Sequence, residues 1–252
     1  MVTLNGWMRI LSVSLLGTLG CAAGVEAAPN SGLDLTQPLL QAGVSYQSTY
    51  FYPGAVGSTR AFTASIPLTV GQLKVAFPFG RHPYVASNTG VSDKGDAFIV
   101  SYNYILPART ANFRQTFGLA FESPSGGASS SGEQQIAPLY QLAYRVNNAA
   151  SILVLAKYTV GYNATASSAR YNELTLSPSA LISLRANTYA ALTSEYHRYS
   201  GYRNDTTYDS ILNVGRLFSG FNVRAYYGLP LGIYSYRHLF RSSYGLSTSI
   251  QL

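Results

Sequence analysis

Cysteine and charged residues are both scarce in this sequence of 252 residues. The one cysteine, Cys21, lies near the N-terminus, so the rest of the chain must fold without a disulfide. Asp, Glu, Lys and Arg together make up 11% of the residues, against about 25% in ordinary soluble domains. A water-facing exterior normally carries many more charges than this. The composition therefore disfavours an ordinary soluble domain.

Long apolar runs are missing as well. The longest predominantly apolar run is segment 10–25, and it falls short of the roughly 20 residues that a membrane-spanning helix needs. A membrane protein without such helices must be a closed β-barrel, because only closure pairs every backbone group within lipid. Tyrosine (21 residues) and glycine (23 residues) are abundant instead, and short alternating stretches favour an all-β fold.

The N-terminus predicts a secretory signal peptide. Arg9 precedes the uncharged segment 10–25, and Val25-Glu26-Ala27 places small residues at the cleavage positions. We therefore expect a signal peptide over 1–27, a periplasmic arm over 28–39 and a barrel over 40–252. A lipoprotein anchored at Cys21 is the alternative, although Thr18 stands where such motifs usually have a bulky aliphatic residue.

Strict alternation is clearest in residues 113–122, "FRQTFGLAFE". One face carries Phe113, Phe117, Leu119 and Phe121, with Gln115 as the polar exception, and the other carries Arg114, Thr116, Gly118, Ala120 and Glu122. Similar alternation predicts twelve strands, at 40–51, 61–70, 73–79, 97–106, 113–123, 136–146, 150–160, 171–184, 188–200, 207–217, 221–229 and 242–252.

The connections between these segments tend to alternate between long and short. The long ones are 52–60, 80–96, 124–135, 161–170, 201–206 and 230–241; the short ones are 71–72, 107–112, 147–149, 185–187 and 218–220. Bacterial outer-membrane barrels have long outer loops, short periplasmic turns and an even number of strands. The sequence thus predicts an antiparallel up-and-down transmembrane β-barrel with both ends in the periplasm.

Aromatic residues on the apolar faces gather toward the strand ends, as expected for rings at lipid headgroups. Those expected near the periplasmic ends are Phe113, Phe221, Tyr102, Tyr104 and Tyr144; those near the outer ends are Tyr50, Phe62, Tyr158, Tyr196, Tyr208, Tyr227 and Tyr244. The alternative is a soluble sandwich whose core holds these rings.

The same alternation points charged residues into the lumen, with opposite signs toward its two ends. Basic residues toward the periplasm are Lys74, Arg114, Arg145, Arg185 and Arg224, and residues toward the outside are Glu122, Lys157, Glu173, Glu195, His197 and Asp209. Such a field selects ions or orients charged solutes. Alternatively, these groups brace the wall or hold an arm inside the barrel.

One constellation suggests an enzyme. His197 and Asp209 are expected on adjacent strands, both facing inward with Glu195 nearby. A histidine beside a carboxylate can act as a general base, but no serine is singled out by its spacing.

Three stretches carry a resemblance to a known family: "GDAFIVSYNYIL" (95–106), "FGLAFESPSGG" (117–127) and the final "YGLSTSIQL" (244–252). They resemble the outer-membrane transporters grouped as the MetA-pathway-of-phenol-degradation family. The resemblance covers about residue 90 to the end. It implies an envelope protein of transporter-like role and supplies no catalytic residues. The chain departs from many outer-membrane barrels by ending in Leu252 and not in Phe.

Together these observations predict a porin-like channel in the outer membrane of a Gram-negative cell. It would pass small solutes, with a mild preference for anions, and would depend on outer-membrane lipids and the barrel-insertion machinery. We expect no cofactor, no metal and no nucleic acid. A barrel hydrolase using His197 and Asp209, and a structural or adhesive barrel, are the alternatives.

Overall fold

A computed structural model describes residues 40–51, 56–79, 97–110, 112–124, 134–162, 171–184, 187–201, 205–231 and 240–251. These residues form twelve β-strands in one closed barrel. The strands are β1 (Gln41–Phe51), β2 (Val56–Leu68), β3 (Gly71–Phe79), β4 (Ala97–Thr110), β5 (Phe113–Pro124), β6 (Gln134–Arg145), β7 (Ala150–Tyr162), β8 (Tyr171–Ser183), β9 (Thr188–Gly201), β10 (Asp205–Phe218), β11 (Phe221–Pro230) and β12 (Phe240–Gln251). The predicted fold class and strand number are confirmed.

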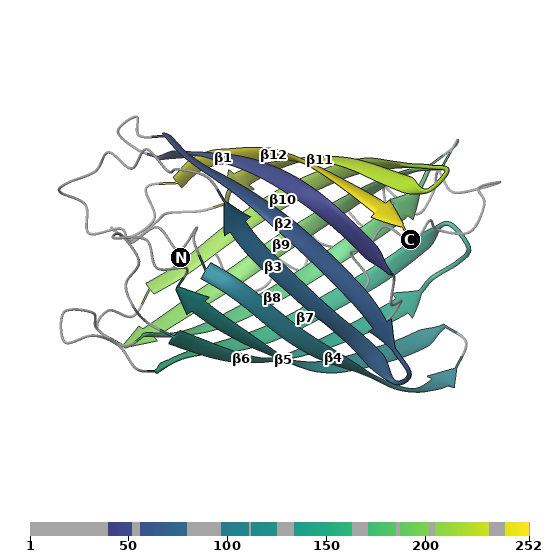
Figure 1. Cartoon of the computed structure of the whole chain (residues 1–252), viewed down its shortest axis with the longest axis horizontal. Helices are drawn as coiled ribbons and strands as arrows, with labels where there is room; N and C mark the ends of the chain where they lie inside the picture. Colours follow the sequence, from purple (N-terminus) through teal and green to yellow (C-terminus); the bar gives the residue numbers. More distant parts are fainter. Residues whose placement is uncertain are drawn as a thin grey trace.

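Every strand pairs antiparallel with its neighbours in the sequence, and β1 pairs with β12 to close the ring (Figure 1). The closing ladder runs from Gln41↔Gln251 to Phe51↔Phe240. A closed ring has no edge strand, so no row of backbone groups is left without a partner. This is the condition that a sheet must meet to lie in lipid.

The strands have the length needed to cross a bilayer. The shortest, β3, has 9 residues and the longest have 14, while a tilted membrane strand needs about 9–11. The strands run obliquely to the long axis of the barrel, and the short turns lie at the end that holds the C-terminus (Figure 1). The β2–β3 turn is Thr69–Val70 and the β10–β11 turn is Ser219–Gly220, where Gly220 has a φ of 83°.

Several strands extend into segments that the sequence predicted to be connections, and β2 and β4 extend farthest. β2 begins at Val56 and not at residue 61, because its ladder with β1 continues to Tyr50↔Val56. β4 runs on to Thr110, with a shift of register after Leu106. Pro107 follows directly and has no N–H to donate to the ladder, which explains the irregularity. Cross-strand hydrogen bonds hold these Gly-, Ser- and Pro-containing stretches extended despite their loop-like composition.

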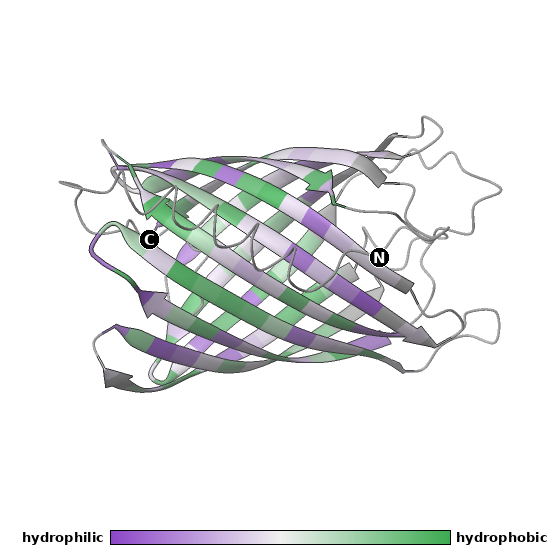
Figure 2. Ribbon diagram, turned by 180° about the vertical axis from the view of Figure 1, so that it is seen from behind, coloured by the Kyte–Doolittle hydropathy of each residue, from purple (hydrophilic) through white to green (hydrophobic). Residues whose placement is uncertain are grey.

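The apolar face of each strand lies on the outside of the barrel. In β5, Leu119 keeps 47% of its surface exposed, while its neighbour Ala120 keeps 4%. Other exposed apolar residues include Phe117, Leu246 and Ile250. Hydrophobic and hydrophilic bands alternate along the strands (Figure 2). An exterior this apolar is what a barrel in lipid presents, and it contradicts the alternative of a soluble sandwich with a buried aromatic core.

Aromatic rings are exposed toward both ends of this exterior. Tyr104, Tyr144 and Phe221 are exposed toward the short turns, and Tyr50, Phe62, Tyr158, Tyr227 and Tyr244 toward the long connections. Tyr102 is exposed too, but it lies opposite Leu119, near the middle of the strands. Tyr196 and Tyr208 contact each other, with ring centroids 5.1 Å apart. These positions match two aromatic belts at membrane surfaces.

No helix in the ranges given above is long and apolar enough to span a membrane. The predicted signal peptide (1–27) and arm (28–39) lie outside the described residues, so both stay predictions.

Candidate functional site

The inner wall of the barrel carries most of the charged residues singled out from the sequence. The burial pattern of their strands places on inward-facing positions Lys74 (β3), Arg114 (β5), Arg145 (β6), Lys157 (β7), Glu173 (β8), Glu195 and His197 (β9), Asp209 (β10) and Arg224 (β11). The side chain of Glu122 and the whole of Arg185 lie outside what the structure describes. Lys74, Arg114, Arg145 and Arg224 lie in the half with the short turns.

Four residues come together in the opposite half, and we call them the His197 cluster: Glu173, Glu195, His197 and Asp209. His197 Nδ1 lies 2.8 Å from Glu173 Oε1, and its Nε2 lies 3.3 Å from Glu195 Oε2 and 3.9 Å from Asp209 Oδ2. Thr175 donates a hydrogen bond to Glu173 Oε1 at 3.3 Å. The cluster is therefore built from three adjacent strands, β8, β9 and β10.

The hydrogen-bond geometry indicates the charge of His197. Each ring nitrogen faces a carboxylate oxygen, and ionised carboxylates only accept hydrogen bonds. An imidazole donates from both nitrogens only when it is doubly protonated, so this arrangement fits an imidazolium. With three carboxylates beside it, the cluster carries more negative than positive charge.

The strand register decides which members of the cluster meet. His197 lies opposite Thr175 on β8 and Thr207 on β10, while Asp209 lies opposite Glu195. The predicted placement of His197 and Asp209 on adjacent strands is confirmed, with their side chains 3.9 Å apart, but Glu173 lies nearer to the imidazole, at 2.8 Å. The alternation places Glu173 inward, but sequence alone does not give the register that brings it to His197.

The basic side chains in the half with the short turns are spread over more strands than the His197 cluster. Arg114 lies opposite Ala143, two residues before Arg145 on the same face of β6, so the two arginines are diagonal neighbours. Arg224 Nε donates a hydrogen bond to Ser247 Oγ on β12 at 3.2 Å. Basic side chains in this half thus come from four strands, β3, β5, β6 and β11, of which β11 pairs with β10 of the His197 cluster.

Part of the inner wall is packed with apolar and aromatic side chains. Tyr189 is fully buried with Leu181 and Ala191, and Leu217 packs against them. The Tyr189 hydroxyl and the Asn222 side-chain amide exchange hydrogen bonds of 3.3 and 3.2 Å. This buried group was not predicted from the sequence, although its members occupy inward positions of the predicted strands.

The expected hydrolase geometry is not found at His197. Both ring nitrogens face carboxylates, and the hydroxyl of Thr175 lies 3.4 Å from Nδ1, the nitrogen already facing Glu173. A general base needs a free nitrogen lone pair directed at the nucleophile. Within the described part of the chain, no three His, Cys, Asp or Glu side chains are arranged to hold a metal ion.

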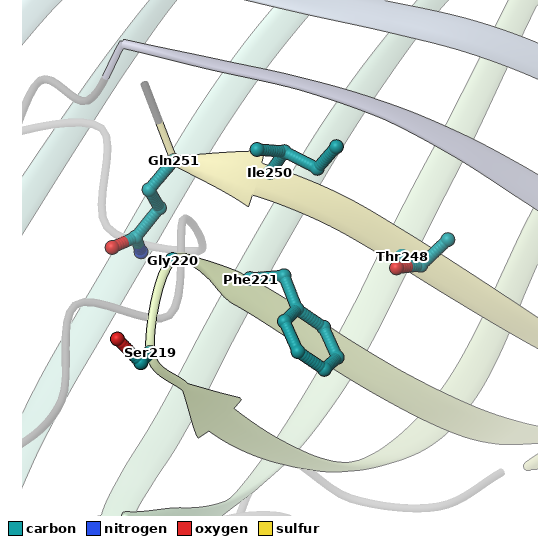
Figure 3. Close-up of a pocket in the computed structure, with 6 residues that line it drawn as sticks. All are labelled: Ser219, Gly220, Phe221, Thr248, Ile250 and Gln251. Atoms are coloured by element: carbon teal, nitrogen blue, oxygen red, sulfur yellow. The ribbon is translucent and has the colours of Figure 1, made fainter.

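A separate hollow lies at the rim with the short turns, where the β10–β11 turn meets the end of β12. It is lined by Ser219, Gly220, Phe221, Thr248, Ile250 and Gln251 (Figure 3). Phe221 and Ile250 are exposed and directly paired across the two strands. The hollow therefore belongs to the barrel's exterior and not to the lumen.

Comparison with known proteins shows likeness at the level of the fold. No family model matches the chain, and no curated protein matches it. The COG4313 outer membrane channel from Pseudomonas putida F1 is similar with a TM-score of 0.69 at 11% identity, over 90% of this chain and 100% of that chain. A NanC porin (TM-score 0.60, 12% identity, 84% and 100% covered) and a KdgM porin (0.55, 11%, 83% and 99%) are similar too.

The resemblance to the MetA-pathway family stays a prediction, since no family model supports it. At these identities the likeness concerns architecture alone. The chain is a closed, twelve-stranded antiparallel β-barrel with the fold of outer-membrane channels.

Proposed function

We propose that this protein is an outer-membrane channel for the passive passage of small solutes. The observation that carries the proposal is the combination of an apolar, aromatic-belted exterior with a polar and charged inner wall. Lipid would surround the first and water and solutes would meet the second. The shared fold of three solved channels and porins supports the same reading.

The proposal extends to location, assembly and family. An exported chain with this exterior would lie in outer-membrane lipid and reach it through the barrel-insertion machinery. The MetA-pathway transporters, which the segments 95–106 and 117–127 resemble, are the family we propose.

A mild anion preference is the finer part of the proposal. Lys74, Arg114, Arg145 and Arg224 place positive charge around the lumen near the short turns, and a ring of fixed positive charge lowers the barrier for anions. One of the solved porins, KdgM, has been determined in complex with oligogalacturonate. The acidic His197 cluster opposes this preference, so we expect modest and not strict selectivity.

Single-channel recording tests the proposal. Purified protein in a planar lipid bilayer should give steady, ion-conducting steps, because water in the lumen carries ions. Heat-denatured protein from the same preparation is the control, since any contaminating detergent pores would survive boiling. A folded barrel that gives no steps above this control would contradict channel function.

A structural or adhesive barrel is the second candidate, favoured by one observation. Leu153, Leu181 and Tyr189 are buried on inward positions in the half with the short turns, and apolar packing there narrows the lumen. A silent barrel whose loops bind a partner would support this candidate.

A further inference from the structure

Two carboxylates of the His197 cluster face each other directly. Glu195 on β9 lies opposite Asp209 on β10, and both side chains point into the lumen. Like charges at directly opposite positions of an antiparallel pair destabilise the sheet. If these residues served only to stabilise the wall, two carboxylates would not be expected at opposite positions. A positively charged group near both carboxylates would offset their repulsion.

His197 supplies only part of that positive charge. Its Nδ1 proton faces Glu173 at 2.8 Å and its Nε2 proton faces Glu195 at 3.3 Å. Asp209 Oδ2 is 3.9 Å from Nε2, which is too far for a hydrogen bond. Both N–H donors of the imidazolium therefore face other carboxylates, and neither donates a hydrogen bond to Asp209.

Two polar atoms in this part of the inner wall are buried without a hydrogen-bond partner. One is Asp209 Oδ1 and the other is the hydroxyl of Thr207, a residue only 2% exposed. Thr207 lies opposite His197 and shares the inward face of β10 with Asp209. Orphaned buried polar groups are rare in folded proteins and mark places where a ligand or water completes the hydrogen bonding.

The two opposed carboxylates have side chains that a solute can reach, although the Oδ1 atom of Asp209 is itself buried. The Glu195 and Asp209 side chains are 28% and 23% exposed, while the Glu173 side chain, held by His197 and Thr175, is 11% exposed. The accessible part of the cluster, Glu195 and Asp209, thus supplies negative charge and hydrogen-bond acceptors.

We propose that Glu195, Asp209 and Thr207 form a binding subsite for the primary ammonium group of a solute inside the lumen. An ammonium group brings one positive charge and three N–H donors, which match two carboxylates and a hydroxyl. Charge-assisted bonds of this kind are about twice as strong as neutral ones. The inference rests on the proposed channel function, because solutes would reach the subsite through the open lumen. It narrows the class of transported solutes to small amines.

Binding of 1,4-diaminobutane to the purified, folded barrel in detergent, measured by calorimetry, tests the subsite without requiring conduction. The neutral 1,4-butanediol has the same carbon chain and serves as the control probe. We expect measurable binding of the diamine and none of the diol. Equal binding of both probes would mean that the carboxylates do not recognise charge.

Substitutions that are expected to change diamine binding in opposite directions provide a second test. Asp209→Asn and Glu195→Gln should each weaken diamine binding about tenfold, as expected for loss of one charge-assisted contact. His197→Gln should strengthen it, because the resident positive charge is removed while the carboxylates remain. Asn213→Ser, four residues from Asp209 on the same face of β10, should leave it unchanged. Weaker binding by His197→Gln, or unchanged binding by the double variant Glu195→Gln/Asp209→Asn, would overturn the subsite.

Folding and function are separated by two further measurements. The double variant removes like-charge repulsion, so it should fold at least as well as the parent and show the same gel mobility before heating. Diamine should also reduce the parent's single-channel current and spare that of the double variant. Binding without any channel current would retain the subsite and overturn the channel, whereas current without diamine binding would retain the channel and overturn the subsite.

Discussion

The ring of Tyr189 lies directly over Gly215, its cross-strand partner on β10, so closely that a Cβ at Gly215 would overlap the ring. The same relation recurs between Tyr226 on β11 and Gly245 on β12. Glycine is required at both places because any side chain would occupy the space of the ring. The lumen wall is thus built partly from aromatic rings laid over glycines.

Gly215→Ala should lower the free energy of unfolding by about 1–3 kcal/mol, since the added methyl group overpacks the space held by Tyr189. Most of this loss should disappear when the ring is removed first by Tyr189→Ala. Urea unfolding of the four proteins of this double-mutant cycle, in lipid vesicles, measures the coupling. Additive effects of the two substitutions would show that ring and glycine do not interact.

Leu119 and Leu68 test whether the exterior faces lipid. Both are 47% exposed, but Leu119 lies midway along β5 and Leu68 ends β2 beside a short turn. Leu119→Arg should cost about 2–4 kcal/mol, as expected for the bilayer midplane, and Leu68→Arg about 0–1 kcal/mol, as expected near the interface. Reversible unfolding in vesicles gives both values. Equal small costs would indicate a water-facing exterior.

Closure of the β1–β12 ladder should make the barrel resistant to sodium dodecyl sulfate. Unheated and boiled samples are therefore expected to migrate differently on a detergent gel, because only boiling opens the ring. Recovery of the protein from membranes and not from the soluble periplasm should accompany the shift. Identical mobility together with a soluble protein would contradict the membrane barrel.

Arg114 and Arg145 should contribute to anion preference, since they are diagonal neighbours facing the lumen. Arg114→Glu/Arg145→Glu should move the reversal potential toward cations in dilute salt. The shift should fade in 1 M salt, where the Debye length is about 3 Å. Arg216→Glu is the matched control: Arg216 lies near the same end but outside the lumen, 5.2 Å from the centre of the Phe218 ring. An unchanged reversal potential in the double variant would assign these arginines to bracing the wall.

The strands, their number and the orientation of their faces follow from the sequence. In residues 113–122 the alternation alone separates Leu119, which is exposed, from Ala120, which is buried, because extended chains place successive side chains on opposite faces. Scarce charge and missing apolar helices then leave the closed barrel as the architecture. The ends of some strands, such as Val56 and Thr110, were not predicted from the sequence. At these ends, hydrogen bonds from a neighbouring strand outweigh the local preference of the residues for loop conformations.

Contacts between strands were decided only by the tertiary structure. The sequence placed Glu173, Glu195, His197 and Asp209 on inward faces, but a shift of register moves a residue past its neighbours on the next strand. The structure selects Glu173 as the nearest partner of His197, sets Glu195 against Asp209, and lays Tyr189 over Gly215. Periodicity is a property of one strand and can be read from it, whereas register is a property of two strands and depends on the whole closed ring.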